Sequence, residues 1–124
     1  MFEKKKKILV LEDEPALSKA LCIKLKNDGF EPILCENGED AIQEIDTGKF
    51  DLVILDLVIY GVDGFEVLKY SKKKNADVPV FVVSNLSQKE DMDRVFEMGA
   101  NKYFIKSNVS LTEILEEVKA LLNK

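Results

Sequence analysis

Several polar residues in this sequence directly follow short apolar runs, and their types would suit metal binding and phosphoryl transfer. They are Glu12, Asp13 and Glu14 after Ile8–Leu11, Asp56 after Leu52–Leu55, Ser84 and Asn85 after Val80–Val83, and Lys106 after Lys102–Ile105. Asp56 is the most telling, because a carboxylate buried behind an apolar strand without partners would cost several kcal/mol or more. We therefore predict either that the Asp56 carboxylate is paired with another group or that it lies at an exposed strand end as part of a functional site.

The chemistry follows from the charges and the donor atoms. Glu12, Asp13 and Asp56 would carry three negative charges, which a divalent cation and Lys106 would bring to about neutral. The chain has no histidine, and oxygen donors suit Mg²⁺ or Mn²⁺ better than zinc. A carboxylate beside such a cation can attack a phosphoryl group and form an acyl phosphate. Lys106 and the Ser84 hydroxyl could position and neutralise its oxygens.

Simpler interpretations exist for each residue alone. Glu12, Asp13 and Glu14 could be N-capping or first-turn acids, which the helix dipole favours. Small hydroxyls often end strands, and a single lysine says little, so Ser84 and Lys106 are uninformative separately. Their shared position after successive apolar runs is what favours a common site.

The elements that would position these residues alternate along the chain. We predict strands over Ile8–Leu11, Phe30–Cys35, Leu52–Leu55, Val80–Val83 and Lys102–Ile105. We predict helices over about Glu14–Asp28, Glu39–Asp46 and Phe65–Lys74, a fourth from the capping-box sequence Ser87–Glu90 to Met98, and a fifth opened by the capping box Ser110–Glu113. Gly29 and Gly99 suit helix ends, and Pro32 makes its strand an edge strand.

This alternation predicts an α/β fold with a parallel sheet between two helical layers. Three of the strands are apolar at every position, as strands buried on both faces are. The carboxyl ends of parallel strands lie at one edge, where ligands bind in such folds. The polar residues above should therefore converge on one cleft.

Composition agrees with a single domain over residues 1–124. Apolar residues make up 46% and charged residues 33% of the chain, and the apolar runs are too short for a signal peptide or a membrane span, so we expect a cytoplasmic protein. The net charge of −5 and the single arginine argue against nucleic acid as a partner. The run Lys4–Lys7 is best interpreted as a solvated lead-in. Cys22 and Cys35 suggest core packing and no disulfide framework.

The motifs "VLEDEP" (Val10–Pro15), "DLVILDLVIYGVDG" (Asp51–Gly64), "VVSN" (Val82–Asn85) and "GANKYFIKS" (Gly99–Ser107) resemble, in order and spacing, the receiver domain of two-component response regulators. The resemblance covers essentially the whole chain. It implies a flavodoxin-like, doubly wound (βα)5 fold with strand order 2-1-3-4-5. It also implies the chemotaxis-type single-domain form, with no effector domain, and a fragment of a longer regulator is the alternative.

The resemblance assigns roles to individual residues. Asp56 matches the phosphoacceptor, and the metal ligands would be Glu12, Asp13, Asp56 and the carbonyl of Val58, with Mg²⁺ as the cofactor. Ser84 and Tyr103 match the residues that switch on phosphorylation, and Lys106 matches the lysine that pairs with the aspartate or its phosphate. The chain would catalyse only its own phosphorylation and dephosphorylation. The donor would be a sensor histidine kinase or a phosphotransfer protein.

The output would pass to a partner protein through the face formed by the fourth helix, the fifth strand and the fifth helix. Phe96 and Met98 could join Tyr103 in that face, although core packing is the simpler interpretation of Phe96. A degenerate receiver that acts without phosphorylation is the main alternative. A flavin binder is disfavoured because the acidic "EDEP" would repel phosphate, and Val58 stands where a phosphatase would need a second aspartate.

Three departures from the family pattern matter. Ser107 replaces the usual proline after the lysine, so a trans peptide becomes accessible there. Ile59 and Tyr60 replace the usual Met-Pro. Tyr60 could cover the cleft or offer a surface to a partner, although loop packing is the simpler interpretation. Val58 and Leu86 occupy the two variable positions beside the phosphoryl group, and their apolar side chains predict a long-lived aspartyl phosphate.

Overall fold

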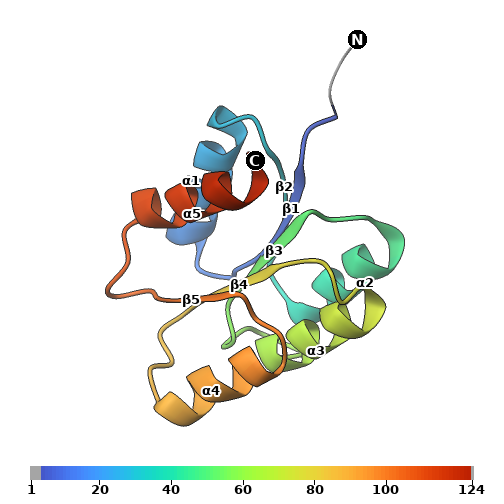
Figure 1. Cartoon of the computed structure of the whole chain (residues 1–124), viewed down its shortest axis with the longest axis vertical. Coiled ribbons are helices and arrows are strands. Elements are labelled where there is room, and N and C mark those ends of the chain that lie inside the picture. Colours follow the sequence, from blue (N-terminus) through green and yellow to red (C-terminus); the bar gives the residue numbers. More distant parts are fainter. Residues whose placement is uncertain (1–3, 124) are drawn as a thin grey trace.

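Five parallel strands form one sheet in the order β2-β1-β3-β4-β5, as shown by a computed structural model that describes residues 4–123 (Figure 1). The strands are β1 (Lys7–Leu11), β2 (Glu31–Cys35), β3 (Leu52–Leu55), β4 (Val80–Ser84) and β5 (Lys102–Ile105). The helices are α1 (Pro15–Asn27), α2 (Gly38–Thr47), α3 (Gly64–Lys74), α4 (Lys89–Glu97) and α5 (Leu111–Leu122). Met1–Glu3 and Lys124, which belong to the predicted domain, lie outside the described residues.

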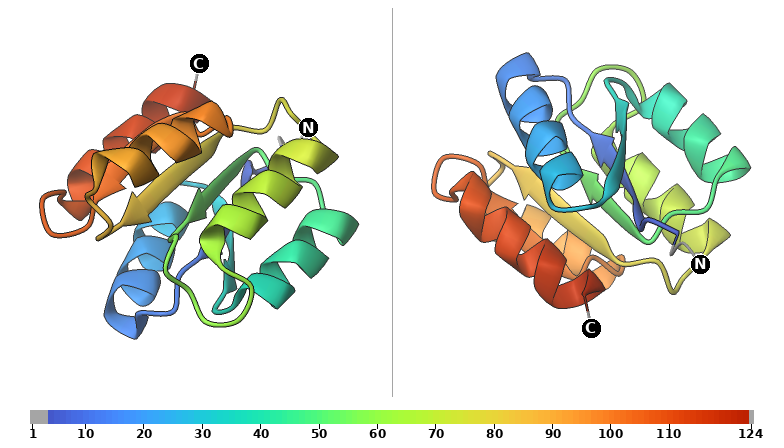
Figure 2. Two further views of the ribbon diagram at one scale, coloured as in Figure 1. Left: turned by 90° about the horizontal axis from the view of Figure 1, so that it is seen from below. Right: turned by 90° about the horizontal axis from the view of Figure 1, so that it is seen from above.

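The helices cover both faces of the sheet, which confirms the three-layer α/β prediction. Figure 2 shows α1 and α5 packed together on one face, and α2, α3 and α4 on the other. Each face has its own core. Leu21 and Leu25 of α1 and Ile114 of α5 belong to one core, and Ala41 of α2 and Val67 of α3 belong to the other.

The strand sequences explain their places in the sheet. β3 and β4 are buried at every position, as the continuous apolar pattern predicts for strands covered on both faces. β2 lies at one edge, with Pro32 half-buried in it, so the edge prediction is confirmed. Cys35 at the end of β2 packs in the core, and its burial raises the pKa of its thiol to about 12.

At the helix ends, two predictions are correct and one is wrong. Ser110 caps α5 as predicted, because its side chain accepts a hydrogen bond from the Glu113 N–H and Glu113 accepts one from the Ser110 N–H. The capping box predicted at Ser87–Glu90 is wrong, because α4 has Gln88 as its N-cap and no side-chain cap. Gly99, at φ 104°, follows the end of α4 as predicted.

No helix within residues 4–123 has both the length and the apolar character needed to cross a bilayer.

Candidate functional site

The predicted residues do meet at the carboxyl edge of the sheet. Leu11 of β1 pairs with Leu55 of β3, so Glu12 and Asp56 leave neighbouring strands at the same level. Ser84 pairs with Ile105 at the ends of β4 and β5, which places Lys106 at that level too. Strand register thus brings together residues more than 90 positions apart in the chain, such as Glu12 and Lys106.

Three of the carboxylates form a cluster of suitable size for one metal ion. A carboxylate oxygen from each of Glu12, Asp13 and Asp56 lies within 4.8 Å of the others. Glu12 is 3% exposed and Asp56 is 5% exposed, whereas Asp13 lies at the surface. Such a set offers only hard oxygen donors, partly open to water, which is the environment that Mg²⁺ prefers.

Lys106 provides the positive charge of the cluster. Its ammonium lies 2.7 Å from Asp56 Oδ2, 2.9 Å from Glu12 Oε1 and 3.4 Å from Glu14 Oε2. Burial opposes the charge on Lys106, but its hydrogen bonds to Asp56 and Glu12 outweigh burial and raise its pKa. Lys106 therefore stays protonated and holds the phosphoacceptor candidate from one side.

Glu12 has a second structural task. Its Oε2 accepts a hydrogen bond of 2.9 Å from the Glu14 N–H, which fixes the turn between β1 and α1. Burial raises the pKa of Glu12, and the hydrogen bonds from Lys106 and the Glu14 N–H oppose that rise. The alternative interpretation of these acids as caps fails for Glu14, which is the N-cap residue of α1 but makes no side-chain capping bond.

Asp56 is held in position by residues that are close to it in the sequence and in the folded structure. Its Oδ1 accepts a hydrogen bond of 3.2 Å from the Val58 N–H. The first residue of α3, Gly64, passes so close that a Cβ atom there would lie 2.1 Å from the Asp56 carbonyl oxygen. This glycine lets the first residue of α3 pack directly against the backbone of Asp56 and Leu57 at the end of β3.

Ser84 and Tyr103 are linked through the loop after β4. Ser84 is fully buried, and its hydroxyl accepts a hydrogen bond from the Leu86 N–H at 3.3 Å. The Tyr103 hydroxyl donates to the Leu86 carbonyl at 2.6 Å, and burial raises the pKa of Tyr103. Leu86 is thus bonded at both its N–H and its carbonyl by the two residues predicted to switch together.

The loop between β3 and α3 is pinned to the start of α2. The Tyr60 carbonyl accepts a hydrogen bond from the Gly38 N–H, and the Glu39 carboxylate accepts one from the Val62 N–H at 2.9 Å. The Tyr60 side chain itself is 81% exposed, so the interpretation of Tyr60 as a loop-packing residue is wrong for its ring. Val58 is also exposed.

The aromatic residues near α4 correct one further expectation. Phe96 is 45% exposed, so it is not the core residue that its sequence context favoured. Its ring centroid lies 6.5 Å from that of Tyr103, and Met98 and Tyr103 are both half-buried against the core. An apolar surface therefore continues from Tyr103 onto α4.

Two residues at the site were not assigned a role from the sequence. Glu14 is a third carboxylate on Lys106, and Asn85 Oδ1 accepts a hydrogen bond of 3.1 Å from the Ser107 N–H. Both stand next to a predicted residue at a strand end, so position alone could have marked them. The Asn85 bond depends on Ser107 having an N–H, which proline lacks, and the described peptides are all trans.

The fold and the clustered carboxylates define a class of protein, and the sequence places the chain within it. Residues 8–119 match the response regulator receiver domain, and the chain belongs to this family.

Several individual proteins resemble it closely. The phosphate regulon transcriptional regulatory protein PhoB of Escherichia coli is 30% identical over 96% of this chain and 52% of its own length. The alkaline phosphatase synthesis transcriptional regulatory protein PhoP of Bacillus subtilis is 33% identical over 96% of this chain and 49% of its own. The chain thus spans about half the length of the curated relatives it matches.

Solved structures agree in fold. The response regulator protein TrrA from Thermotoga maritima, in complex with Mg²⁺ and BeF, is 36% identical, has a TM-score of 0.82, and matches over 94% of this chain and 99% of its own. A CheY-like receiver domain protein from Methanospirillum hungatei has a TM-score of 0.91 at 22% identity, over 97% of this chain and 95% of its own. The predicted flavodoxin-like strand order is therefore confirmed.

Proposed function

We propose that this chain is a Mg²⁺-dependent phosphoacceptor that takes a phosphoryl group onto Asp56 from a phosphohistidine. The donor would be a sensor histidine kinase or a phosphotransfer protein in the cytoplasm. The observation that carries the proposal is the position of Asp56, whose carboxylate lies 2.7 Å from the Lys106 ammonium and within metal-binding distance of Glu12 and Asp13.

The metal would be held by Glu12, Asp13, Asp56 and the carbonyl of Val58, with Mn²⁺ as a substitute. When bound, it would supply positive charge to the carboxylates and to the phosphoryl oxygens. This requirement suits the cluster, because Lys106 offsets only one of the three negative charges that Glu12, Asp13 and Asp56 carry. Neutralising the remainder allows a phosphoryl group to approach Asp56.

In the transfer itself, an Asp56 carboxylate oxygen attacks the phosphorus atom as the phosphorus–nitrogen bond of the phosphohistidine breaks. The imidazole leaves and Asp56 becomes an acyl phosphate. Lys106 moves its hydrogen bond from Asp56 Oδ2 to a phosphoryl oxygen, and the Ser84 hydroxyl turns from the Leu86 N–H to another. Lys106 already contacts the acceptor, and Ser84 lies at the end of β4, the strand that pairs with β3.

The same hydrogen bonds would carry the signal. If Ser84 leaves the Leu86 N–H, the loop that also holds the Tyr103 hydroxyl is released to rearrange. Tyr103 and the exposed Phe96 would then present a changed surface on α4, β5 and α5 to a partner protein. The domain would be a switch that consumes one phosphoryl group per cycle.

A receiver that signals without phosphorylation is the second candidate. Such a protein would have no need of a lysine, a hydroxyl and three carboxylates at one strand edge. The presence of Glu12, Asp13, Asp56, Ser84 and Lys106 together supports phosphorylation instead.

Intact-mass spectrometry after incubation with acetyl phosphate and Mg²⁺ tests the proposal. We expect one added phosphoryl group, lost in Asp56→Asn and in the presence of a chelator. Asp77→Asn makes the same change at an exposed position away from the site and should be phosphorylated normally. An unphosphorylated but folded wild-type protein, with no spectral change on adding beryllofluoride and Mg²⁺, would contradict the proposal.

A further inference from the structure

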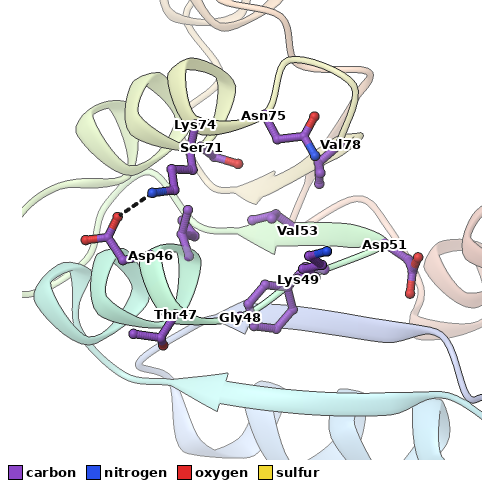
Figure 3. Close-up of a pocket in the computed structure, with 12 residues that line it drawn as sticks. Asp46, Thr47, Gly48, Lys49, Asp51, Val53, Ser71, Lys74, Asn75 and Val78 are labelled. Carbon is purple, nitrogen blue, oxygen red and sulfur yellow. Dashed lines mark ion pairs between the residues drawn. The ribbon is translucent and has the colours of Figure 1, made fainter.

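A cavity of about 560 Å³ opens at the edge of the sheet opposite the acidic site (Figure 3). It lies between the C-terminal ends of α2 and α3, beside the start of β3. Asp51 at this edge and Asp56 at the other are separated by the length of β3, or roughly 16 Å. The cavity is therefore separate from the carboxylate cluster, and its size is within the range of about 300–1,000 Å³ usual for small-molecule sites.

The buried and half-buried side chains that line the cavity are apolar except for that of Ser71. Ile45, Phe50, Val53 and Val78 contribute the apolar side chains. Ser71, on α3, is only 3% exposed, and Figure 3 shows its hydroxyl directed into the space between α3 and β3. Every fully enclosed polar side-chain atom of the described residues has a partner, but none of their hydrogen bonds uses this hydroxyl. It is therefore open to the cavity and can bond a ligand.

The rim contains charged and amide groups that belong to α2, α3 and the loop before β3. Asp46 accepts a hydrogen bond from the Tyr70 hydroxyl and pairs with Lys74 at 3.5 Å. Asp51 accepts a hydrogen bond of 2.8 Å from the Lys7 N–H. Both carboxylates at the rim are thus already engaged, whereas no ion pair within residues 4–123 uses Lys49.

A second cavity adjoins the first and is lined mainly by lysines. The two share Thr47, Gly48, Lys49 and Asp51, and the second adds Lys4, Lys5, Lys6 and Lys7. Six lysines and two aspartates therefore line the pair, an excess of four positive charges in a chain of net charge −5. A local charge opposite to that of the whole molecule favours an anionic ligand at this edge.

We propose that these adjoining cavities bind a nucleotide, with its base in the apolar cavity and its phosphates among the lysines. The apolar wall suits a planar ring, and the Ser71 hydroxyl and the Asn75 amide can hydrogen-bond to ring nitrogens or to an exocyclic group. Lys49 stands where the two cavities meet and would bind the first phosphate. The lysine run that the sequence presents as a solvated lead-in then forms the phosphate-binding part of the site.

Titration of ¹⁵N-labelled protein with adenosine diphosphate, in chelator-containing buffer, tests this proposal. The chelator removes any metal-dependent binding at the carboxylate cluster, so the result is independent of phosphorylation. We expect shifts in residues 45–53 and 71–78, and we expect Lys49→Glu to weaken binding about tenfold by reversing a charge near the phosphates. Lys69→Glu, an exposed change on α3 outside both cavities, should leave binding unchanged.

Pyrophosphate and adenosine separate the two halves of the site. We expect each alone to bind more weakly than adenosine diphosphate, and Ser71→Ala to weaken adenosine more than pyrophosphate. Equal binding of pyrophosphate and adenosine diphosphate would overturn the base site, because lysines alone would then account for the affinity. Shifts confined to residues around Asp56, or a Lys49→Glu protein that binds normally, would overturn the proposal as a whole.

Discussion

If Asp56 is phosphorylated as proposed, we expect the side chains of Val58 and Leu86 to affect how easily water reaches the acyl phosphate. Neither can hydrogen-bond to an attacking water, and Leu86 is half-buried with its backbone bonded to Ser84 and Tyr103. Hydrolysis requires a water held in line with the phosphorus atom, so the aspartyl phosphate should be long-lived.

Val58→Asn would place an amide at this position and should speed hydrolysis by about tenfold, because a polar group can orient the water. Decay of the phosphorylated protein after acetyl phosphate is removed, followed by intact mass, measures the rate. Tyr60→Asn adds the same amide at a second exposed position of the same loop and should change the rate little. Rapid hydrolysis in the wild type, with no change in Val58→Asn, would contradict the expectation.

Residue types at strand ends were enough to predict the central part of the site. Asp56, Lys106 and Glu12 could be grouped because parallel strands end together, and the structure places them within hydrogen-bonding distance. The Asn85–Ser107 bond could not be predicted in this way. It depends on how two loops approach each other, which neither the strand pattern nor the residue types specify.

Among the elements, α4 and α5 show how far local sequence determines a helix start. Both "SQKE" and "SLTE" have the spacing of a capping box, but only Ser110 forms one. Ser110 is the N-cap of α5 and has the extended conformation of a cap, with φ −90° and ψ 156°, whereas the extended N-cap of α4 is Gln88, one residue after Ser87. The loop after β4 is instead bonded to Ser84 and Tyr103 at Leu86, so tertiary contacts set where α4 begins.

The two serines make a matched pair for a stability measurement. Ser110→Ala should lower the free energy of unfolding by about 1 kcal/mol, because the Glu113 N–H loses its acceptor. Ser87→Ala should change it by less than about 0.5 kcal/mol, since Ser87 is exposed and caps nothing. Urea unfolding followed by circular dichroism measures both. An equal loss in the two variants would show that α4 also begins at a serine cap.

Over the whole molecule, the alternation of strands and helices was enough to predict three layers, because it follows from hydrophobic periodicity. The order of strands was not available from periodicity and came from the resemblance to receiver domains. The distribution of charge over the surface could not be predicted either, because it appears only when the chain is folded. Lysines gather at one edge of the sheet and carboxylates at the other, although the two kinds of residue are interspersed along the chain.

The carboxylates at the carboxyl edge of the sheet repel one another. Metal binding should weaken this repulsion and so stabilise the entire domain. Three carboxylates lie within 4.8 Å of one another. Asp13 is exposed and takes part in no hydrogen bond or ion pair among the described residues. Asp13→Asn should therefore raise the free energy of unfolding by about 0.5–1 kcal/mol in the presence of a chelator, because it removes a repelling charge without breaking a contact.

Adding Mg²⁺ should reverse the order of stability of the wild type and Asp13→Asn. For a dissociation constant of about 1 mM, 10 mM Mg²⁺ would stabilise the wild type by about 1.4 kcal/mol and raise the midpoint of its thermal unfolding by roughly 4–7 °C. Asp13→Asn should gain much less, so the order of stability reverses when metal is added. Thermal unfolding with chelator and with Mg²⁺ measures both, and Asp77→Asn should follow the wild type. A metal-free Asp13→Asn protein that is less stable than the wild type would show that Asp13 has a structural role instead.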